Sequence, residues 1–577
     1  MSAPLSTLST DILILGAGGA GLFAALHAKR AAPELDVTIA VKGLLGKCGC
    51  TRMVQGGYNV ALAPGDSVER HFMDTVDGGK WLNDQDLAWL LVTQAQVRIR
   101  ELENELGCFF DRNPDGTIHQ KAFAGQTFDR TVHKGDLTGI EIVNRLAEQV
   151  WRRDVRRLED HRAVELIAAA DGSGAAGVLM LDMRTGAPLL VRAKATLLAT
   201  GGGPTMYKYH TPSGDKSCDG LAMALRAGLP LRDMEMVQFH PTGLLAGPGT
   251  RMTGTVLEEG LRGAGGYLLD GRAERFMFAY DERGERATRD VVSRSIQDRI
   301  RQGFATPNGG VWIEMGHLGP DNVRRGFKGM VERCADCGFD LAAGRVEVVP
   351  TAHYMMGGVV FGADCATPMP RLFAAGEDTG GVHGANRLGG NGVANSTVFG
   401  GLAGDAMAPF VRAHGAHADP DPAAIEAGLW HLEAPFRRRP GDLNAIRERL
   451  YDVMWEDVGI LRTGDGLRRG LAALDDLDRA LEAAGVADGD RAYNLTWHDW
   501  LNLKNLVLVS RSIAAAALAR EDSRGAHFRE DFPDTSDLAT SRYTVARLAE
   551  GGLAITTEPV HFTRVVPGET LLREAAE

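Results

Sequence analysis

The chain lacks the features that mark several specialised protein classes. It has 577 residues, of which 44% are hydrophobic and 24% are charged, and its formal net charge is −12. A chain with this excess of acidic residues is not expected to present a nucleic-acid-binding surface. The first ten residues contain neither a basic segment nor an apolar core, so we expect no secretory signal.

Long hydrophobic runs are missing as well. The most apolar candidate, residues 506–518, is interrupted by Ser510, Arg511 and Ser512. A membrane-spanning helix needs about 20 mostly apolar residues. The sequence therefore predicts a protein with no direct membrane span and a cytoplasmic location.

Cysteines are few and scattered. The seven cysteines form an odd set that does not suggest a disulfide framework. Cys334 and Cys337 form one CxxC pair, but no second pair stands at the spacing of a zinc site. We interpret this pair as incidental and predict no metal centre.

The first structured segment is a βαβ unit. Residues 11–15 form a short apolar strand, residues 16–21 (GAGGAG) follow, and residues 22–29 continue as a helix before a second strand at 37–41. In such a unit, Gly16 permits the tight turn, Gly18 lets the backbone approach a diphosphate, and Gly21 lets helix and strand pack closely. Gly19 belongs to the same loop, which predicts a dinucleotide site.

The acidic residue that usually binds the ribose is absent from the end of the second strand. That place holds Val41 and Lys42, whereas Glu34 and Asp36 precede the strand. This departure weakens a generic NAD interpretation. Because Lys42 could meet a phosphate, NADP stays open on this feature alone.

Two later glycine-rich segments also fit a cofactor. Residues 47–62 follow the βαβ unit with small side chains, as if wrapping a flat ring system, and residues 197–203 (LLATGGG) run from an apolar strand into a glycine turn. Further predicted cofactor contacts in and beyond these segments are Gln55, Gly56, Gly57, Thr200, Gly201, Asp219 and Asn391.

The segment from Gln238 to Arg294 concentrates charge among glycines. Within it stand His240, Glu258, Glu259, Arg262, Arg289 and Arg294. An arginine has a planar donor fork that matches a carboxylate, and arginines flanking a glutamate could relay a proton. The alternative is a set of solvated ion pairs, which contribute little to stability. Composition alone favours that alternative.

Ordered motifs over most of the chain change this balance. QFHPTG (238–243), EEGLRGAGGYL (258–268), ATRDVVSRS (287–295), AHYMMGG (352–358) and HGANRLGGN (383–391) occur in this order. Together with EDVGILRTGDGL (456–467) and EDSRGAHFREDFP (521–533), they resemble the flavoprotein subunits of succinate dehydrogenase and fumarate reductase, a family that includes L-aspartate oxidase.

The resemblance implies roles for particular residues. Gly16, Gly18 and Gly21 match the FAD diphosphate loop, and Glu377 matches the residue that holds the sugar-alcohol chain of the flavin. The residues that match the grip on the substrate dicarboxylate are His240, His353, Arg289 and Arg387. Arg289 matches the acid that protonates fumarate while flavin N5 passes a hydride, with Glu259 and Arg262 behind it as a relay.

Three departures from the family pattern matter. Cys50 stands where membrane-bound members have the histidine that links FAD covalently, so we expect noncovalent FAD, with a thioether to Cys50 left open. Glu258 stands where the family has a threonine, and an ionised Glu258 would repel a substrate carboxylate. Either Glu258 is protonated, or it points away, or the substrate carries a hydroxyl, amine or amide at that end, which puts plain succinate or fumarate in doubt. The loop 122–126, which contains Phe123 and ends at Gln126, resembles the dehydrogenase version and lacks the glutamate of aspartate oxidases.

The implied fold is α/β: a Rossmann-like FAD-binding domain (1–240 and 350–410), an inserted α+β capping domain (241–349), a C-terminal helical domain (420–520) and a tail (521–577). Helical patterns cover 422–433, 443–458, 466–484 and 501–520, and the tail is predicted to form short strands within 542–567. Two functional classes stay open. The chain is either a self-contained FAD enzyme that reduces or oxidises the Cα–Cβ bond of a small carboxylate, with an unknown electron donor or acceptor such as oxygen, or an electron-transfer subunit that docks an iron–sulfur protein in a membrane complex.

Overall fold

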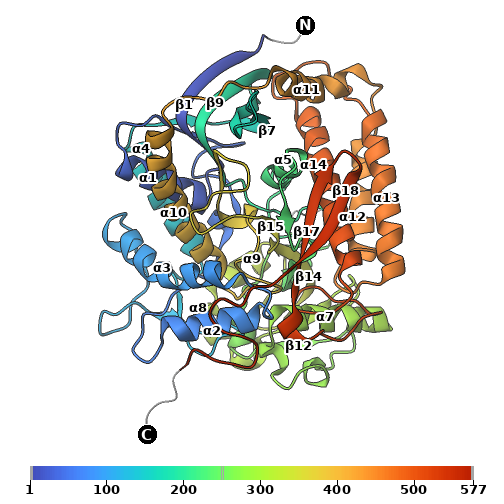
Figure 1. Ribbon diagram of the computed structural model, residues 1–577. Coiled ribbons are helices and arrows are strands. Elements are labelled where there is room, and N and C mark those ends of the chain that lie inside the picture. Colours follow the sequence, from blue (N-terminus) through green and yellow to red (C-terminus); the bar gives the residue numbers. More distant parts are fainter. Residues whose placement is uncertain (1–3, 248–249, 251, 573–577) are drawn as a thin grey trace.

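The computed structural model describes residues 4–247, 250 and 252–572, and it is built around one large sheet (Figure 1). The strand order is β6-β2-β1-β9-β8-β7, and β16 also pairs with β9. Strands β1, β2, β6 and β16 run parallel to their neighbours, as a dinucleotide-binding unit requires. The bounds of the strands are β1 Ser6–Leu15, β2 Val37–Ala40, β6 Val155–Leu158, β7 His161–Ala168, β8 Ala175–Asp182, β9 Ala187–Leu198 and β16 Leu372–Ala374.

Helices α1 (Gly19–Ala31) and α10 (Asn391–His414) lie side by side against this sheet (Figure 1). Glycines of α10 make this possible: a Cβ on Gly400 would lie 2.5 Å from the carbonyl oxygen of Ala20, and one on Gly404 would lie 2.4 Å from that of Ala24. The C-terminal segment of the FAD-binding domain thus completes a core begun by the N-terminus. The other helices of this domain are α2 Val68–Gly78, α3 Gln85–Asn104, α4 Thr138–Trp151 and α5 Asp219–Arg226.

The small antiparallel sheet β3-β5-β4 holds the loop that begins near Lys121. It consists of β3 Tyr58–Asn59, β4 Gln120–Lys121 and β5 Thr131–Val132. Because β3 follows the glycine segment at residues 56–57 directly, this sheet fixes both segments beside the cofactor side of the fold.

The capping region has its own four-stranded antiparallel sheet, in the order β11-β14-β13-β12. Its elements are β11 Val237–Leu244, α6 Gly260–Gly263, β12 Tyr267–Leu269, α7 Arg289–Arg299, β13 Val311–Glu314, α8 Pro320–Gly326, α9 Lys328–Ala335 and β14 Arg345–Met355. The predicted domain boundaries near 240 and 350 fall inside β11 and β14. These two long strands therefore run continuously from the FAD-binding region into the cap.

Three helices pack together on the side drawn in orange in Figure 1: α12 Leu443–Glu456, α13 Gly464–Ala483 and α14 Leu495–Ala519. Helix α11 Pro422–Glu433 packs against β7. The predicted helix at 422–433 is confirmed, and α14 begins six residues before its predicted start at Leu501. Helix α14 is long and apolar enough to cross a membrane, but 67% of its apolar window is buried in the fold. Buried Trp497 and Trp500 anchor it against its neighbours, as in a core helix.

The C-terminal tail returns to the FAD-binding region. The predicted strands near 542–567 are confirmed as β17 Arg542–Ala549 and β18 Gly552–Pro559, which extend a sheet in the order β15-β10-β17-β18. The partners are β10 Leu231–Arg232 and β15 Gly358–Val359. The segment at 521–533 packs against the end of α14, where Arg529 Nη1 donates to the carbonyl oxygens of Ala517 and Leu518.

Candidate functional site

One cavity of about 650 Å³ runs between the FAD-binding region and the cap. The glycine loops line one end of it, and charged residues of the Gln238–Arg294 segment line the other. Most of the predicted site residues meet here. They are Gly16, Gly18, Gly19, Lys42, Cys50, Gln55, Gly56, Gly57, Phe123, Thr200, Gly201, Asp219, His240, Glu258, Glu259, Arg289, His353, Glu377 and Arg387.

The turn between β1 and α1 has no room for side chains. Gly16 adopts φ +106°, and a Cβ there would lie 2.1 Å from the carbonyl oxygen of Ala199. A Cβ on Gly21 would lie 1.9 Å from the carbonyl oxygen of Gly16. The backbone N–H of Gly19 donates to Thr51 Oγ1 at 3.1 Å. The start of α1 thus faces the cavity with bare backbone, which suits a diphosphate.

The other glycine turn is held by a carboxylate. Asp378 accepts hydrogen bonds from the backbone N–H groups of Thr200 and Gly201, and from Thr200 Oγ1 at 3.0 Å. Gly201 has φ +82°, and no atom of the described residues lies within 4 Å of the place where its Cβ would stand. Beside it, Glu377 accepts from the Met355 N–H at 3.0 Å, and burial raises the pKa of Glu377 to about 7.

The substrate end of the cavity centres on an arginine–glutamate pair. Arg289 Nε donates to Glu259 Oε2 at 2.8 Å, and its Nη2 lies 2.7 Å from the same oxygen. Arg262 Nη2 lies 3.9 Å from Glu259 Oε1, on the side away from the cavity. Burial works to raise the pKa of Glu259, but the charges of Arg289 and Arg262 outweigh it and the pKa is lowered. Glu259 is therefore an anion held between two guanidinium groups.

Gln238 connects this pair to the second arginine. Its Oε1 accepts from Arg289 Nη1 at 3.1 Å and from Arg387 Nη2 at 3.0 Å, and its Nε2 donates to the carbonyl oxygen of Arg387 at 2.7 Å. Burial, and next the charge of Arg289, lower the pKa of Arg387 to about 10. Sequence reasoning missed Gln238 as a site residue, although it opens the QFHPTG motif and is fully buried on β11.

Two histidines complete this end. The rings of His240 on β11 and His353 on β14 lie 5.4 Å apart between centroids, since the two strands are paired. His353 Nδ1 shares a 2.8 Å hydrogen bond with Thr211 Oγ1. Burial, and then the charges of nearby arginines, hold the pKa of both histidines well below the usual range. Both imidazoles are thus neutral hydrogen-bonding groups.

Comparison with known proteins identifies the family to which the chain belongs. A family model described as "FAD binding domain" matches residues 11–393, and one described as "Fumarate reductase flavoprotein C-term" matches residues 447–572. The chain belongs to the fumarate reductase flavoprotein family.

Relatives agree along the whole length. The chain is 40% identical to a fumarate reductase (CoM/CoB) subunit of Methanothermobacter marburgensis, over 91% of this chain and 95% of that one. It is 32% identical to a solved quinol fumarate reductase chain of E. coli, with a TM-score of 0.92 over 98% and 99% of the two chains. A Mycobacterium smegmatis Sdh1 structure solved with UQ1 matches at 35% identity, over 96% and 95%, with a TM-score of 0.86.

The flavoprotein fold and the bare glycine loops of the cavity fit FAD, so the chain is an FAD-dependent oxidoreductase. Gly16, Gly18 and Gly19 would hold the diphosphate, and Glu377 would accept from the hydroxyls of the sugar-alcohol chain. Lys42 does not stand free for a phosphate: its Nζ lies 2.8 Å from Asp219 Oδ2. Arg162 Nη2 lies 2.8 Å from Asp219 Oδ1. The predicted cofactor residue Asp219 thus balances the charges of Lys42 and of the buried Arg162.

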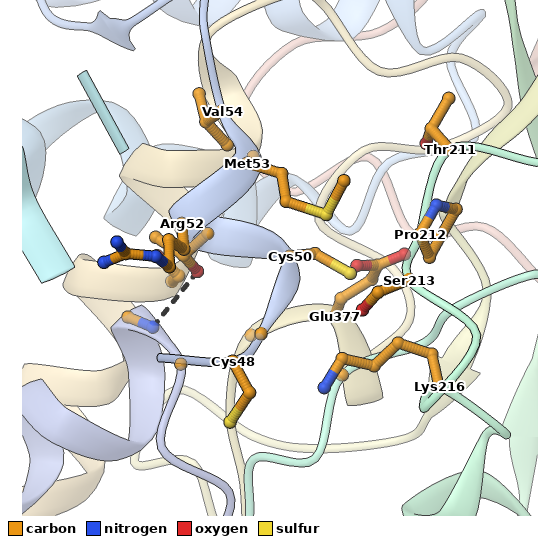
Figure 2. A pocket seen from close by; sticks show the side chains of 18 of the residues that line it. Cys48, Cys50, Arg52, Met53, Val54, Thr211, Pro212, Ser213, Lys216 and Glu377 are labelled. Carbon is orange, nitrogen blue, oxygen red and sulfur yellow. Dashed lines mark hydrogen bonds between the residues drawn. The ribbon is translucent and has the colours of Figure 1, made fainter. Parts of the chain in front are cut away.

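Cys50 lines the cavity from the short 3₁₀ helix at Cys50–Met53. Figure 2 shows its side chain with those of Met53, Glu377 and Lys216 around the same space. Burial, and next the charge of Glu377, raise the pKa of the Cys50 thiol to about 12. A thiol in this state is a poor nucleophile, which supports noncovalent FAD.

Besides Gly21, which packs inside the turn, three predicted residues stand outside the cavity lining. Gln126 donates from Nε2 to the carbonyl oxygen of Gly389 at 3.0 Å, and Asn391 accepts from Asn59 Nδ2 at 2.8 Å. Gln126 thus satisfies a buried backbone carbonyl of the loop that carries Arg387. Asn391 instead joins a side-chain network, in which Asn59 Nδ2 also donates to the Gly389 carbonyl oxygen at 2.6 Å. The third, Arg262, stands behind Glu259 as the relay assignment requires.

Glu258, the last predicted site residue, lines the cavity next to Lys121. Its Oε2 lies 3.5 Å from Lys121 Nζ and has no hydrogen-bond partner among the described residues. Burial raises the pKa of Glu258, and Lys121 only partly offsets this. Within the ranges that the structure covers, no group of three or more His, Cys, Asp or Glu residues is placed to hold a metal ion.

Proposed function

We propose that this flavoprotein reduces the C=C bond of a small dicarboxylate, with Arg289 as the proton donor to carbon. The observation that carries the proposal is the set of contacts around Arg289. Its guanidinium is fixed by Glu259 and Gln238, lines the cavity, and is joined through Gln238 to Arg387. A group held on two sides keeps one orientation, which is what a directed proton transfer needs.

The chain's own residues divide the remaining work. Arg387 offers a guanidinium whose Nε has no hydrogen-bond partner among the described residues, so it is available to a carboxylate. The neutral imidazoles of His240 and His353 can donate hydrogen bonds to the same substrate. Glu259 and Arg262 would return a proton to Arg289 after each turnover. FAD, when bound and reduced by the electron donor, would supply the hydride.

The preferred direction is reduction. Cys50 stands at the family's linking-histidine position with a thiol that stays protonated, so FAD would be noncovalent and would have a lower reduction potential than a linked flavin. A lower potential favours passing electrons to an alkene over withdrawing them from a saturated dicarboxylate. The loop at 122–126 lacks the glutamate of aspartate oxidases, so an L-aspartate substrate is less well supported.

A second candidate concerns the source of electrons. The M. marburgensis relative is named as one subunit of its fumarate reductase. We infer that this chain also works with a separate electron-transfer protein, for which an iron–sulfur protein is the expected class, and that it does so in the cytoplasm. Co-purification of the tagged chain from its native cell would test this, and recovery of the chain alone in fully active form would contradict it.

Anaerobic stopped-flow absorbance of the photoreduced holoenzyme tests the principal proposal. We expect rapid flavin reoxidation on mixing with fumarate or a substituted four-carbon enoate, and slow reoxidation with monocarboxylate enoates. Fast reoxidation by oxygen, with no reaction of any enoate, would replace the proposal with an oxidase.

A further inference from the structure

Arg333 is a cavity-lining arginine that none of the motifs includes. It stands on α9 of the cap, where its Nη1 donates to the carbonyl oxygen of Val256 at 2.8 Å. The Gln55 amide, with its oxygen turned toward the guanidinium, accepts from Nη2 at 2.9 Å. Among the described residues, no carboxylate lies within 4 Å of this guanidinium; Glu258 and Asp136 act on it from farther away. Its neutral partners leave its charge uncompensated at contact distance.

The position of Arg333 is fixed by close packing of α9. A Cβ on Gly329 would lie 1.8 Å from Asp136 Oδ2, so the start of the helix is seated directly against the segment that precedes α4. Residues four apart share a helix face. Arg333 therefore lies one turn farther along the face that Gly329 presses against the FAD-binding region, and it reaches into the cavity from there.

Two other cationic side chains at this end already have a carboxylate partner. Arg289 has Glu259 at 2.7 Å, Lys121 has Glu258 at 3.5 Å, and the two histidines are neutral. Arg387, like Arg333, has no carboxylate within 4 Å in the part of the chain that the structure describes. Two guanidinium groups, one from each side of the cavity, thus lack an anionic contact.

Phe123 places these two arginines around one space. A Cβ on Gly56, the neighbour of Gln55, would lie 2.5 Å from the Phe123 ring, and a Cβ on Gly389 would lie 2.6 Å from the same ring. The Gly389 position is also 3.2 Å from Arg289 Nη2. The Phe123 ring therefore lies close both to the segment that contacts Arg333 and to the segment that carries Arg387.

We propose that Arg333 is a second carboxylate-binding residue, so that the substrate is a dianion held by Arg387 from the FAD-binding region and by Arg333 from the cap. This inference rests on the proposed function and specifies its substrate class. A substrate with only one carboxylate would leave one guanidinium without its anion. Discrimination between dicarboxylates and monocarboxylates then depends on Arg333.

Equilibrium binding of malonate and of its monomethyl ester to the oxidised holoenzyme tests this, with the flavin absorbance change as the signal. Malonate has no reducible bond, so the measurement needs no turnover. We expect Arg333→Met to weaken malonate binding about 10- to 100-fold, the range for one charge-assisted hydrogen-bonded contact. Binding of the monoester, which lacks the second charge, should change less than about 3-fold.

Arg325→Met is the matched control, because Arg325 lies on α8 and contacts Asn322 at the surface; both ligands should bind it as they bind the native protein. Flavin content and thermal midpoint of Arg333→Met confirm that it folds. Three results for Arg333→Met would each overturn the proposal. They are an equal loss of affinity for both ligands, no loss of affinity for malonate, and a shift of the ligand-free flavin spectrum with no change in the ratio of the two affinities. The two proposals can fail separately. If Arg333→Met no longer distinguishes malonate from its monoester, but the native protein reduces no enoate, then Arg333 is a carboxylate-binding residue and only the proposed reaction is wrong.

Discussion

Glu258 and Glu259 are neighbours in the chain and are both nearly fully buried, at 6% and 4% exposure. Their pKa values nevertheless move in opposite directions. Burial raises the pKa of Glu258, whereas for Glu259 the charges of Arg289 and Arg262 overcome the same effect and lower it. Burial is common to both residues, so the partners at contact distance decide the protonation state.

The two glutamates therefore suit different tasks. Glu259 is an anion at rest with two arginine neighbours, one of which lines the cavity. This suits a relay in which Glu259 takes up a proton transiently and returns it to Arg289. Glu258 has one oxygen without a hydrogen bond and a single lysine at 3.5 Å, so its charge depends on conditions and on the bound ligand. One side of the cavity is arranged for proton transfer and the other for recognition.

Removing Arg289 is the strongest way to break this contrast. In Arg289→Gln, Glu259 loses its main partner and should come to resemble Glu258, while the proton donor is lost altogether. We expect fumarate-dependent flavin reoxidation to fall about 10³-fold or more, since loss of an acid and of a preorganised charge are each large effects. Stopped-flow absorbance measures the rate, and the flavin-to-protein ratio should be unchanged.

Arg294→Gln is the control for that variant. Arg294 lies on the same helix but donates to the carbonyl oxygen of Gly525, outside the cavity, so turnover should stay within about 2-fold of the native rate. Substantial turnover in Arg289→Gln would remove the proton-donor assignment. Loss of flavin from it would show instead that Arg289 stabilises the cofactor site.

Another glutamate of the cavity lining, Glu377, extends the contrast to the cofactor end. Glu377 resembles Glu258, because burial raises its pKa, here to about 7. Its ionised form accepts hydroxyl hydrogen bonds on both oxygens, whereas its protonated form presents a donor. FAD affinity should therefore increase as pH rises through about 7. Glu377→Gln should weaken FAD binding roughly 10- to 100-fold and remove the pH dependence, as fluorescence titration of deflavinated protein would show.

The opposite trend with pH would contradict the role of Glu377 as an acceptor. So would equal pH dependence in the native protein and in Glu377→Gln, because the titrating group would then lie elsewhere. Asp378 is the nearest alternative: burial raises its pKa to about 6, but it already accepts from Thr200 and Gly201.

Local sequence patterns predict much of the fold because each one has a physical cause. The βαβ unit follows from an apolar strand followed by glycines, and the structure shows why: a Cβ on Gly16 or Gly21 would collide with backbone. The helix at 422–433 is predicted from its pattern, and the structure shows Asp421 capping it. The cap boundaries near 240 and 350 stay a prediction, because β11 and β14 run across both positions and no composition change marks the crossing.

The site is predicted where a motif carries it and missed where tertiary contacts make it. Arg289, Glu259 and Arg387 stand in motifs, and they meet in the cavity. Gln238 stands in a motif too, but its bridge between Arg289 and Arg387 depends on strand β11 facing a loop almost 150 residues away. Arg333 belongs to no motif, and only the packing of α9 brings it beside Gln55.

Glu258→Thr gives the smallest expected effect and tests the contrast most directly. In the native protein, the KM for fumarate should rise as pH increases above the ordinary glutamate range, because ionisation of Glu258 places a negative charge beside the carboxylate pocket. Threonine removes that charge and leaves Lys121 unpaired, so fumarate should bind roughly 5- to 10-fold more tightly at neutral pH, the order of one screened like-charge interaction.

Steady-state KM for fumarate between pH 5 and 8 measures both the pH dependence and the gain in affinity, and Glu332→Thr on the outer face of α9 is the control. Weaker fumarate binding in Glu258→Thr would show that Glu258 is held protonated and donates to the substrate, which would make its raised pKa part of recognition rather than a source of repulsion.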